Sequence, residues 1–92
     1  MTPADALRAA KECILEHGWA QGLRAVVDTE RHCMVTALAW VTPEDPVAEN
    51  LAFQALQRAT SHFPNDWNDD PERTLDEVLE AFDRAIVLAE IP

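Results

Sequence analysis

The stretch Phe63–Thr74, FPNDWNDDPERT, places acids and amides at the spacing of a calcium-binding loop. Carboxylate and amide oxygens suit Ca²⁺, and the helix–loop–helix calcium motif needs them at the first, third, fifth and twelfth places. The residues at these places are Asp66, Asn68, Asp70 and Glu77. The sixth place requires a glycine with positive φ, but Pro71 stands there and its ring fixes φ at about −65°. Arg73 would also bring a positive charge towards the ion, so the pattern argues against calcium.

Two cysteines and two histidines could in principle assemble a zinc site, namely Cys13, His17, His32 and Cys33. No pair has the C-x-x-C spacing of a zinc motif, and cysteines in helical stripes usually belong to the core. A Cys/His nucleophile would need Cys33 beside His17 or His62, and the sequence motifs of hydrolases and of phosphate-binding loops are missing. We therefore expect no metal site, no cofactor, no catalytic residues and no enzymatic activity. A metal-binding module is the first alternative and a small hydrolase the last.

The charge of the chain restricts its partners. The sequence has 17 acidic and 7 basic residues and a formal net charge of −10. Such a chain repels phosphate backbones and anionic lipid, so we expect neither nucleic acid nor a membrane as partner. A basic protein remains a candidate partner. An acidic mimic of nucleic acid is an alternative, but its acids would have to form one ordered array, whereas here they are spread over helix starts and several faces.

The length fits one domain over residues 1–92, with a core sufficient for a stable fold but small enough to be compatible with a homo-oligomer. The sequence has no signal-peptide pattern and no apolar run of about 18 residues. Its two cysteines fit a reducing compartment better than a disulfide scaffold, so we expect a cytoplasmic protein.

The helical spacing of apolar residues predicts an all-α fold, a compact bundle of about four helices. A first helix over residues 3–17 begins after the cap Thr2 and ends at Gly18. A further helix over residues 47–62 ends before Pro64, because the residue before a proline leaves helical geometry. Its expected buried residues are Leu51, Ala52, Ala55, Leu56 and Ala59.

The capping box of Thr74 and Glu77 predicts the start of the last helix. In this motif, each side chain accepts a hydrogen bond from the other residue's backbone N–H. Its apolar stripe consists of Leu75, Val78, Leu79, Phe82 and Ile86.

Residues 23–41 allow two interpretations. A helix over residues 29–41, capped by Asp28 or Thr29, would be apolar all round, with Trp40 adding to its surface, as in a buried central helix. The β-branched residues also fit a small hairpin, which would make the fold α+β. We favour the helix because an isolated two-stranded ribbon is only marginally stable.

The chain contains three further motifs: a W-x-Q-G turn, a cysteine-led helix of small residues, and W-N-D-x-P-x-R-T before a final helix. Their residues are Trp19, Gln21 and Gly22; Cys33, Ala37 and Leu38; and Trp67, Asn68, Asp69, Pro71, Arg73 and Thr74. In these motifs the chain resembles a family of small uncharacterised proteins from actinobacteria and their phages. Where the family often has cysteine and glycine, this chain has Ala20 and Thr36. The resemblance implies an all-α domain of unknown function in a phage or actinobacterial setting.

Six residues form the candidate binding patch: Trp19, Gln21, Trp67, Asn68, Asp69 and Arg73. In a structural interpretation, Asn68 or Asp69 tethers one loop to the other while both indoles cover the core, and Arg73 is a surface residue. In a functional interpretation, the tryptophans line a recognition surface, because tryptophan and arginine are favoured interface anchors. We expect a non-enzymatic domain that binds a protein, and in a phage setting that protein would belong to the host cell.

Overall fold

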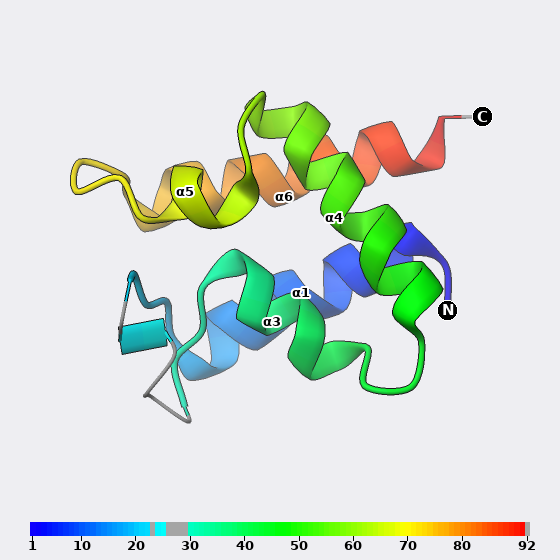
Figure 1. Cartoon of the computed structure of the whole chain (residues 1–92), viewed down its shortest axis with the longest axis horizontal. Helices are drawn as coiled ribbons and strands as arrows, with labels where there is room; N and C mark the ends of the chain where they lie inside the picture. Colours follow the sequence, from blue (N-terminus) through cyan, green and yellow to red (C-terminus); the bar gives the residue numbers. More distant parts are fainter. Residues whose placement is uncertain (23, 26–29, 92) are drawn as a thin grey trace.

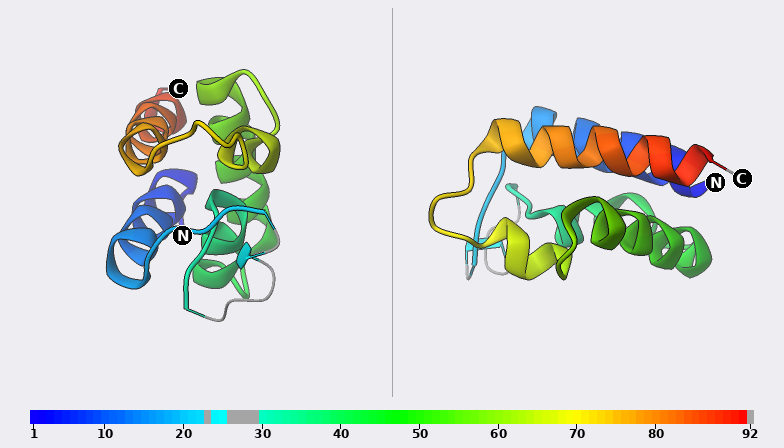
Figure 2. Two further views of the ribbon diagram at one scale, coloured as in Figure 1. Left: turned by 90° about the vertical axis from the view of Figure 1, so that its left-hand side faces the viewer. Right: turned by 90° about the horizontal axis from the view of Figure 1, so that it is seen from above.

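In the computed structural model, which describes residues 1–22, 24–25 and 30–91, the chain forms an all-α bundle. The helices of these residues are α1 (Pro3–His17), α3 (Met34–Val41), α4 (Pro46–Thr60), α5 (Pro64–Asn68) and α6 (Leu75–Glu90). They lie in two layers, with α1 beside α6 in one layer and α3, α4 and α5 in the other (Figures 1 and 2). Both chain termini lie at the same end of the molecule (Figure 1).

The first helix has the predicted bounds because its capping groups are local. The Thr2 hydroxyl accepts a hydrogen bond from the Asp5 backbone N–H at 3.0 Å, and the Asp5 carboxylate accepts one from the Thr2 N–H. Gly18 ends α1 with a φ of +106°, which a side chain would strain. Its N–H donates to the Ile14 carbonyl at 2.8 Å and closes the last turn.

The helix expected over residues 29–41 is present but begins later, at Met34. The predicted caps Asp28 and Thr29 lie outside the described residues. Cys33 caps the helix instead, because its Sγ accepts a hydrogen bond from the Thr36 N–H while its own N–H donates to Thr36 Oγ1. Before it, His32 pairs with Trp19 in a single parallel bridge, and the described residues contain no strand, so the hairpin alternative is wrong.

Trp40 contradicts the expectation of a central helix buried all round. Its side chain is 62% exposed, whereas Met34, Ala37 and Leu38 are buried. The helix has only eight residues, and the side that packs against α1, α4 and α5 carries the buried residues. The opposite side therefore carries its tryptophan into solvent.

The helix α4 begins one residue before the predicted start and ends two before the predicted end. Asp45 caps it, and Ser61 ends it in the left-handed conformation with a φ of +60°. Leu51 was expected in the core but is 43% exposed. The buried face of α4 consists mainly of alanines around Leu56. The small alanine side chains allow α4 to pack close to its neighbours. Leu51 lies at the edge of that face.

The helix α5 was not predicted. Pro64 was expected only to end the preceding helix, yet it also opens a new turn, since its fixed φ suits a first helical position. This short helix ends at Asn68, so its position sets where the connector over residues 69–74 begins.

The capping box of Thr74 and Glu77 begins α6 as predicted. Of the predicted stripe, Val78 and Phe82 are fully buried, whereas Leu75 lies at the exposed edge. The large core side chains are Leu7, Ile14, Met34, Leu38, Leu56, Val78 and Phe82. Within the described residues, no helix is both long and apolar enough to cross a membrane.

Candidate functional site

Asn68 is the centre of the contact between the two loops. It ends α5, its side chain is 0% exposed, and both ends of its amide are hydrogen-bonded. Its Oδ1 accepts from Trp19 Nε1 at 2.8 Å and from the Met34 backbone N–H at 3.2 Å. Its Nδ2 donates to the Ala20 carbonyl and to Asp69 Oδ1, both at 3.1 Å. One buried amide thus joins the turn after α1, the start of α3 and the end of α5.

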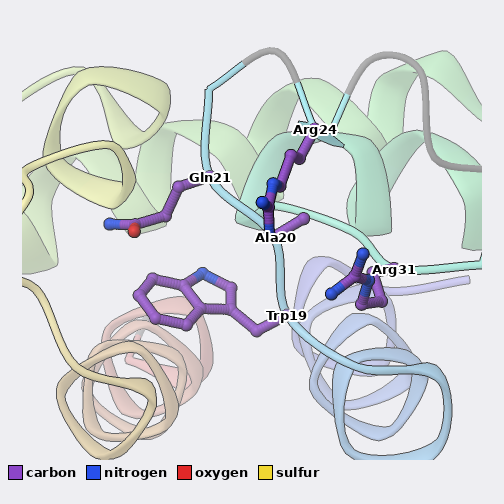
Figure 3. Close-up of a pocket in the computed structure, with 5 residues that line it drawn as sticks. All are labelled: Trp19, Ala20, Gln21, Arg24 and Arg31. Carbon is purple, nitrogen blue, oxygen red and sulfur yellow. The ribbon is translucent and has the colours of Figure 1, made fainter.

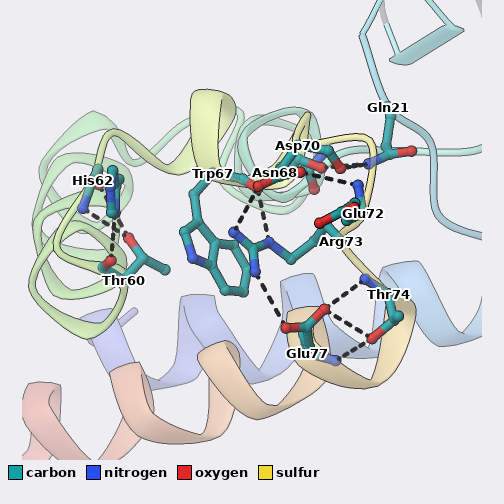
Figure 4. Close-up of polar contacts among 10 residues, drawn as sticks. All are labelled: Gln21, Thr60, His62, Trp67, Asn68, Asp70, Glu72, Arg73, Thr74 and Glu77. Atoms are coloured by element: carbon teal, nitrogen blue, oxygen red, sulfur yellow. Dashed lines mark hydrogen bonds and ion pairs between the residues drawn. The ribbon is translucent and has the colours of Figure 1, made fainter.

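Gln21, which Figure 4 shows, and Asp69 extend this contact at the surface. Gln21 Nε2 donates to the Asn68 carbonyl at 2.9 Å and to the Asp70 carbonyl at 2.7 Å. Asp69 Oδ1 accepts from the Gly22 backbone N–H at 2.8 Å. The sequence predicted that Asn68 or Asp69 would join the two loops, and both do.

Arg73 is not the surface residue that the sequence suggested. Its guanidinium carbon lies 3.7 Å from the centroid of the Trp67 ring, and Nε donates to the Trp67 carbonyl at 3.0 Å (Figure 4). Ion pairs to Asp70 and Glu77, at 3.7 and 3.3 Å, leave its side chain 16% exposed. The Trp67 indole also packs against the core, so Trp67 links Arg73 to the core of the bundle.

Glu77 carries a perturbed charge. The hydrogen bond from the Thr74 backbone N–H, together with the Thr74 hydroxyl and the Arg73 guanidinium, lowers the pKa of its carboxyl below the ordinary value, against a smaller desolvation effect. This shift belongs to a helix cap, and the negative charge also suits the helix N-terminus. The lowered pKa is therefore accounted for by the structural role of Glu77 in capping α6.

Both cysteines are buried and free, Cys13 in α1 and Cys33 at the start of α3. Burial raises the pKa of the Cys13 thiol, and the charge of Glu16 raises it further, which disfavours the thiolate. Within the described part of the chain, no three His, Cys, Asp or Glu residues are grouped so that they could hold a metal ion.

A hollow of about 380 Å³ lies beside the tethered loops, lined by Trp19, Ala20, Gln21, Arg24 and Arg31 (Figure 3). Gly18 is required here, because a Cβ at that position would meet Arg31 Cγ at 2.8 Å. Sequence reasoning found Trp19 and Gln21 but missed the two arginines, since nothing in their spacing places them together.

A second hollow, also of about 380 Å³, lies between the end of α1 and Trp40. It is lined by Glu16, His17, Glu30, His32 and Trp40. The Trp40 ring packs against the buried His32 with centroids 5.4 Å apart and planes tilted by 36°. His17 meets His32 edge-on at 6.3 Å. Sequence reasoning missed this surface, which combines an exposed indole with two carboxylates.

The six candidate residues are thus brought together, but mostly to contact one another. Asn68 is fully buried, Asp69 is exposed, and the other four are half-buried. The predicted contact is structural, and the binding role of the patch stays a prediction. Trp40 differs from the other two tryptophans, because its indole is mainly exposed to solvent.

The model of the family of unknown function DUF6197 matches residues 1–88, in agreement with the resemblance of the sequence to such a family. No curated protein and no solved structure matches the chain. The comparisons therefore assign no activity, cofactor or partner to these residues.

Proposed function

We propose that this chain, which belongs to the family of unknown function DUF6197, is a non-enzymatic domain that binds another protein through a surface centred on Trp40. The observation that carries the proposal is the 62% exposure of this indole. In the phage or actinobacterial setting that the resemblance implies, the domain acts as a phage or prophage accessory protein and the partner is a protein of the host cell.

The three tryptophans differ in what their indoles do. Trp19 donates its N–H to Asn68, and Trp67 contacts both the core and the Arg73 guanidinium. The Trp40 ring packs against His32, with ring centroids 5.4 Å apart, and 62% of the residue is exposed to solvent. Covering an exposed aromatic side chain contributes on the order of 2–3 kcal/mol, which supports a role as an interface anchor.

The shape of the surface supports a protein partner more than a small molecule. The hollow beside Trp40 is bounded by side chains of α1, α3 and the segment before α3 and opens to solvent. Small-molecule sites generally enclose most of their ligand, whereas protein interfaces use shallow surfaces with a few aromatic anchors.

The test compares two variants that each remove an exposed apolar side chain. The tagged wild-type chain, Trp40→Ala and Val87→Ala retain partners from a lysate of the cells that carry the gene, followed by quantitative mass spectrometry. Val87 is 59% exposed and lies on α6, so it is the matched control. We expect one protein to be retained by the wild type and by Val87→Ala and reduced at least about tenfold by Trp40→Ala, with unchanged melting curves.

Equal retention by Trp40→Ala would overturn the proposal. Loss of the partner through Asp69→Ala instead, with an unchanged melting curve, would assign the contact to the six-residue patch. A retained DNA-binding protein that this chain displaces from DNA would favour the acidic mimic, and Trp40-independent binding of a divalent metal would favour the metal-binding module.

A further inference from the structure

We infer that the hollow beside Trp40 receives an arginine or lysine side chain from a basic segment of the partner protein. This inference rests on the proposed function and adds the chemistry of the partner. It is carried by the aromatic surface, the carboxylates around it and the charge of the whole chain.

The indole offers a face for a cation and is held in place to do so. His32 is buried and packs against one side of the Trp40 ring, and His17 meets the edge of His32. This packing restricts the ring while 62% of the residue stays exposed. A guanidinium or ammonium group over an indole face gains electrostatic attraction from the ring, and tryptophan is the best aromatic residue for this contact. In the same chain, Arg73 lies over Trp67 in this way at 3.7 Å.

Two acidic residues line the hollow beside Trp40. Glu16 and Glu30 line the same hollow of about 380 Å³ as the indole, from the end of α1 and from the segment before α3. The Glu16 side chain is 76% exposed, and its Oε2 lies 3.9 Å from Nε2 of His17. A planar guanidinium can therefore cover the ring with its flat face while its N–H groups donate to carboxylate oxygens.

The charge of the whole chain acts in the same direction. With a net charge of −10, the molecule attracts a basic segment over a distance of about 10 Å and repels an acidic one. The overall charge makes the encounter faster, and the hollow determines where the basic side chain binds.

The experiment uses two fluorescein-labelled peptides of the sequence Gly-Arg-Ser-Arg-Gly-Arg-Ser, one with arginine and one with citrulline at every arginine position. Citrulline keeps the shape of arginine but has no charge. Fluorescence anisotropy at low salt measures binding to the wild-type chain, Trp40→Ala, Glu16→Gln and Glu80→Gln. Glu80 is an exposed acid of α6 outside the hollow, so its variant removes the same charge from a different place.

We expect the arginine peptide to bind at least about tenfold more tightly than the citrulline peptide. Trp40→Ala and Glu16→Gln should each weaken binding about fivefold, the scale of an exposed cation–aromatic contact, while Glu80→Gln changes it less than about twofold. Trp40→Phe should lie between the wild type and Trp40→Ala, because phenylalanine keeps a smaller aromatic face.

Equal binding of the two peptides would overturn the inference. An equal loss of affinity in Glu16→Gln and Glu80→Gln would also overturn it, because the attraction would then come from the net charge and not from the hollow. Neither result touches the proposed function, which fails only if retention of the cellular partner does not depend on Trp40. The two failures are therefore distinguishable.

Discussion

Replacing Asn68 by alanine should destabilise the fold more than any surface change in the connector. The substitution leaves the Met34 N–H and the Ala20 carbonyl without their side-chain partner, and both residues are buried. Each buried polar group left without a hydrogen bond costs about 1–3 kcal/mol. The Trp19 indole N–H also loses its acceptor, but it belongs to a half-buried residue that can turn towards water. We expect Asn68→Ala to lower the free energy of unfolding by about 4 kcal/mol.

That loss is a large part of the about 5–14 kcal/mol expected for a domain of this length. In a domain of this size, a loss of 1 kcal/mol lowers the melting temperature by roughly 4–8 °C, so the variant should melt at least about 15 °C lower. Urea unfolding followed by circular dichroism measures the free energy directly. Asn65→Ala is the control, because Asn65 is an exposed asparagine in the same short helix.

A milder variant tests the same contact if Asn68→Ala does not fold. Trp19→Phe removes only the indole N–H and keeps an aromatic ring against the core, so it should cost about 1 kcal/mol. In the double variant with Asn68→Ala, the two losses should not add, since they share one hydrogen bond. A loss below about 1 kcal/mol for Asn68→Ala, or equal losses at Asn65 and Asn68, would refute the reasoning.

The other predictions concern the two charged residues near Trp67. Arg73→Ala should cost about 2 kcal/mol in urea unfolding, because it removes a charged hydrogen bond and a contact over the Trp67 ring; a loss no larger than that of Arg84→Ala, an exposed arginine, would contradict this. The lowered pKa of Glu77 means that the folded state binds its proton less readily than the unfolded state, so its contribution is present above the ordinary pKa and lost as the pH falls through the lowered one. The difference in melting temperature between the wild type and Glu77→Gln should therefore shrink on acidification, and a difference that stays constant down to pH 2 would contradict the assignment.

Local patterns predicted both ends of α1 and the start of α6. The caps of α1 and α6 join residues three positions apart, so Thr2, Thr74 and Glu77 act through contacts that the sequence spacing already contains. The start of α3 was misplaced, because Cys33 is a weak cap by residue type and gains its role from the pairing of the preceding segment with the turn after α1.

In the candidate site, too, some contacts were predicted from the sequence and others depend on the tertiary structure. The sequence predicted that Asn68 or Asp69 would hold the two loops together, since amide and acid groups next to tryptophans in turns need hydrogen-bond partners. It did not reveal that Asn68 would be fully buried, or that Arg73 would lie over Trp67, because both depend on the unpredicted helix α5.

By itself, the sequence determined the acidic charge and predicted the all-α class, both ends of α1 and the capping box that begins α6. These properties depend on residue type and short-range spacing and do not require contacts between helices. The tertiary structure decided which apolar residues reach solvent. A short apolar helix can bury only the side that its neighbours cover, and the packing of α3 against α1, α4 and α5 leaves Trp40 exposed. The same packing brings Glu16 and Glu30 to that tryptophan, although they are 14 positions apart in the chain.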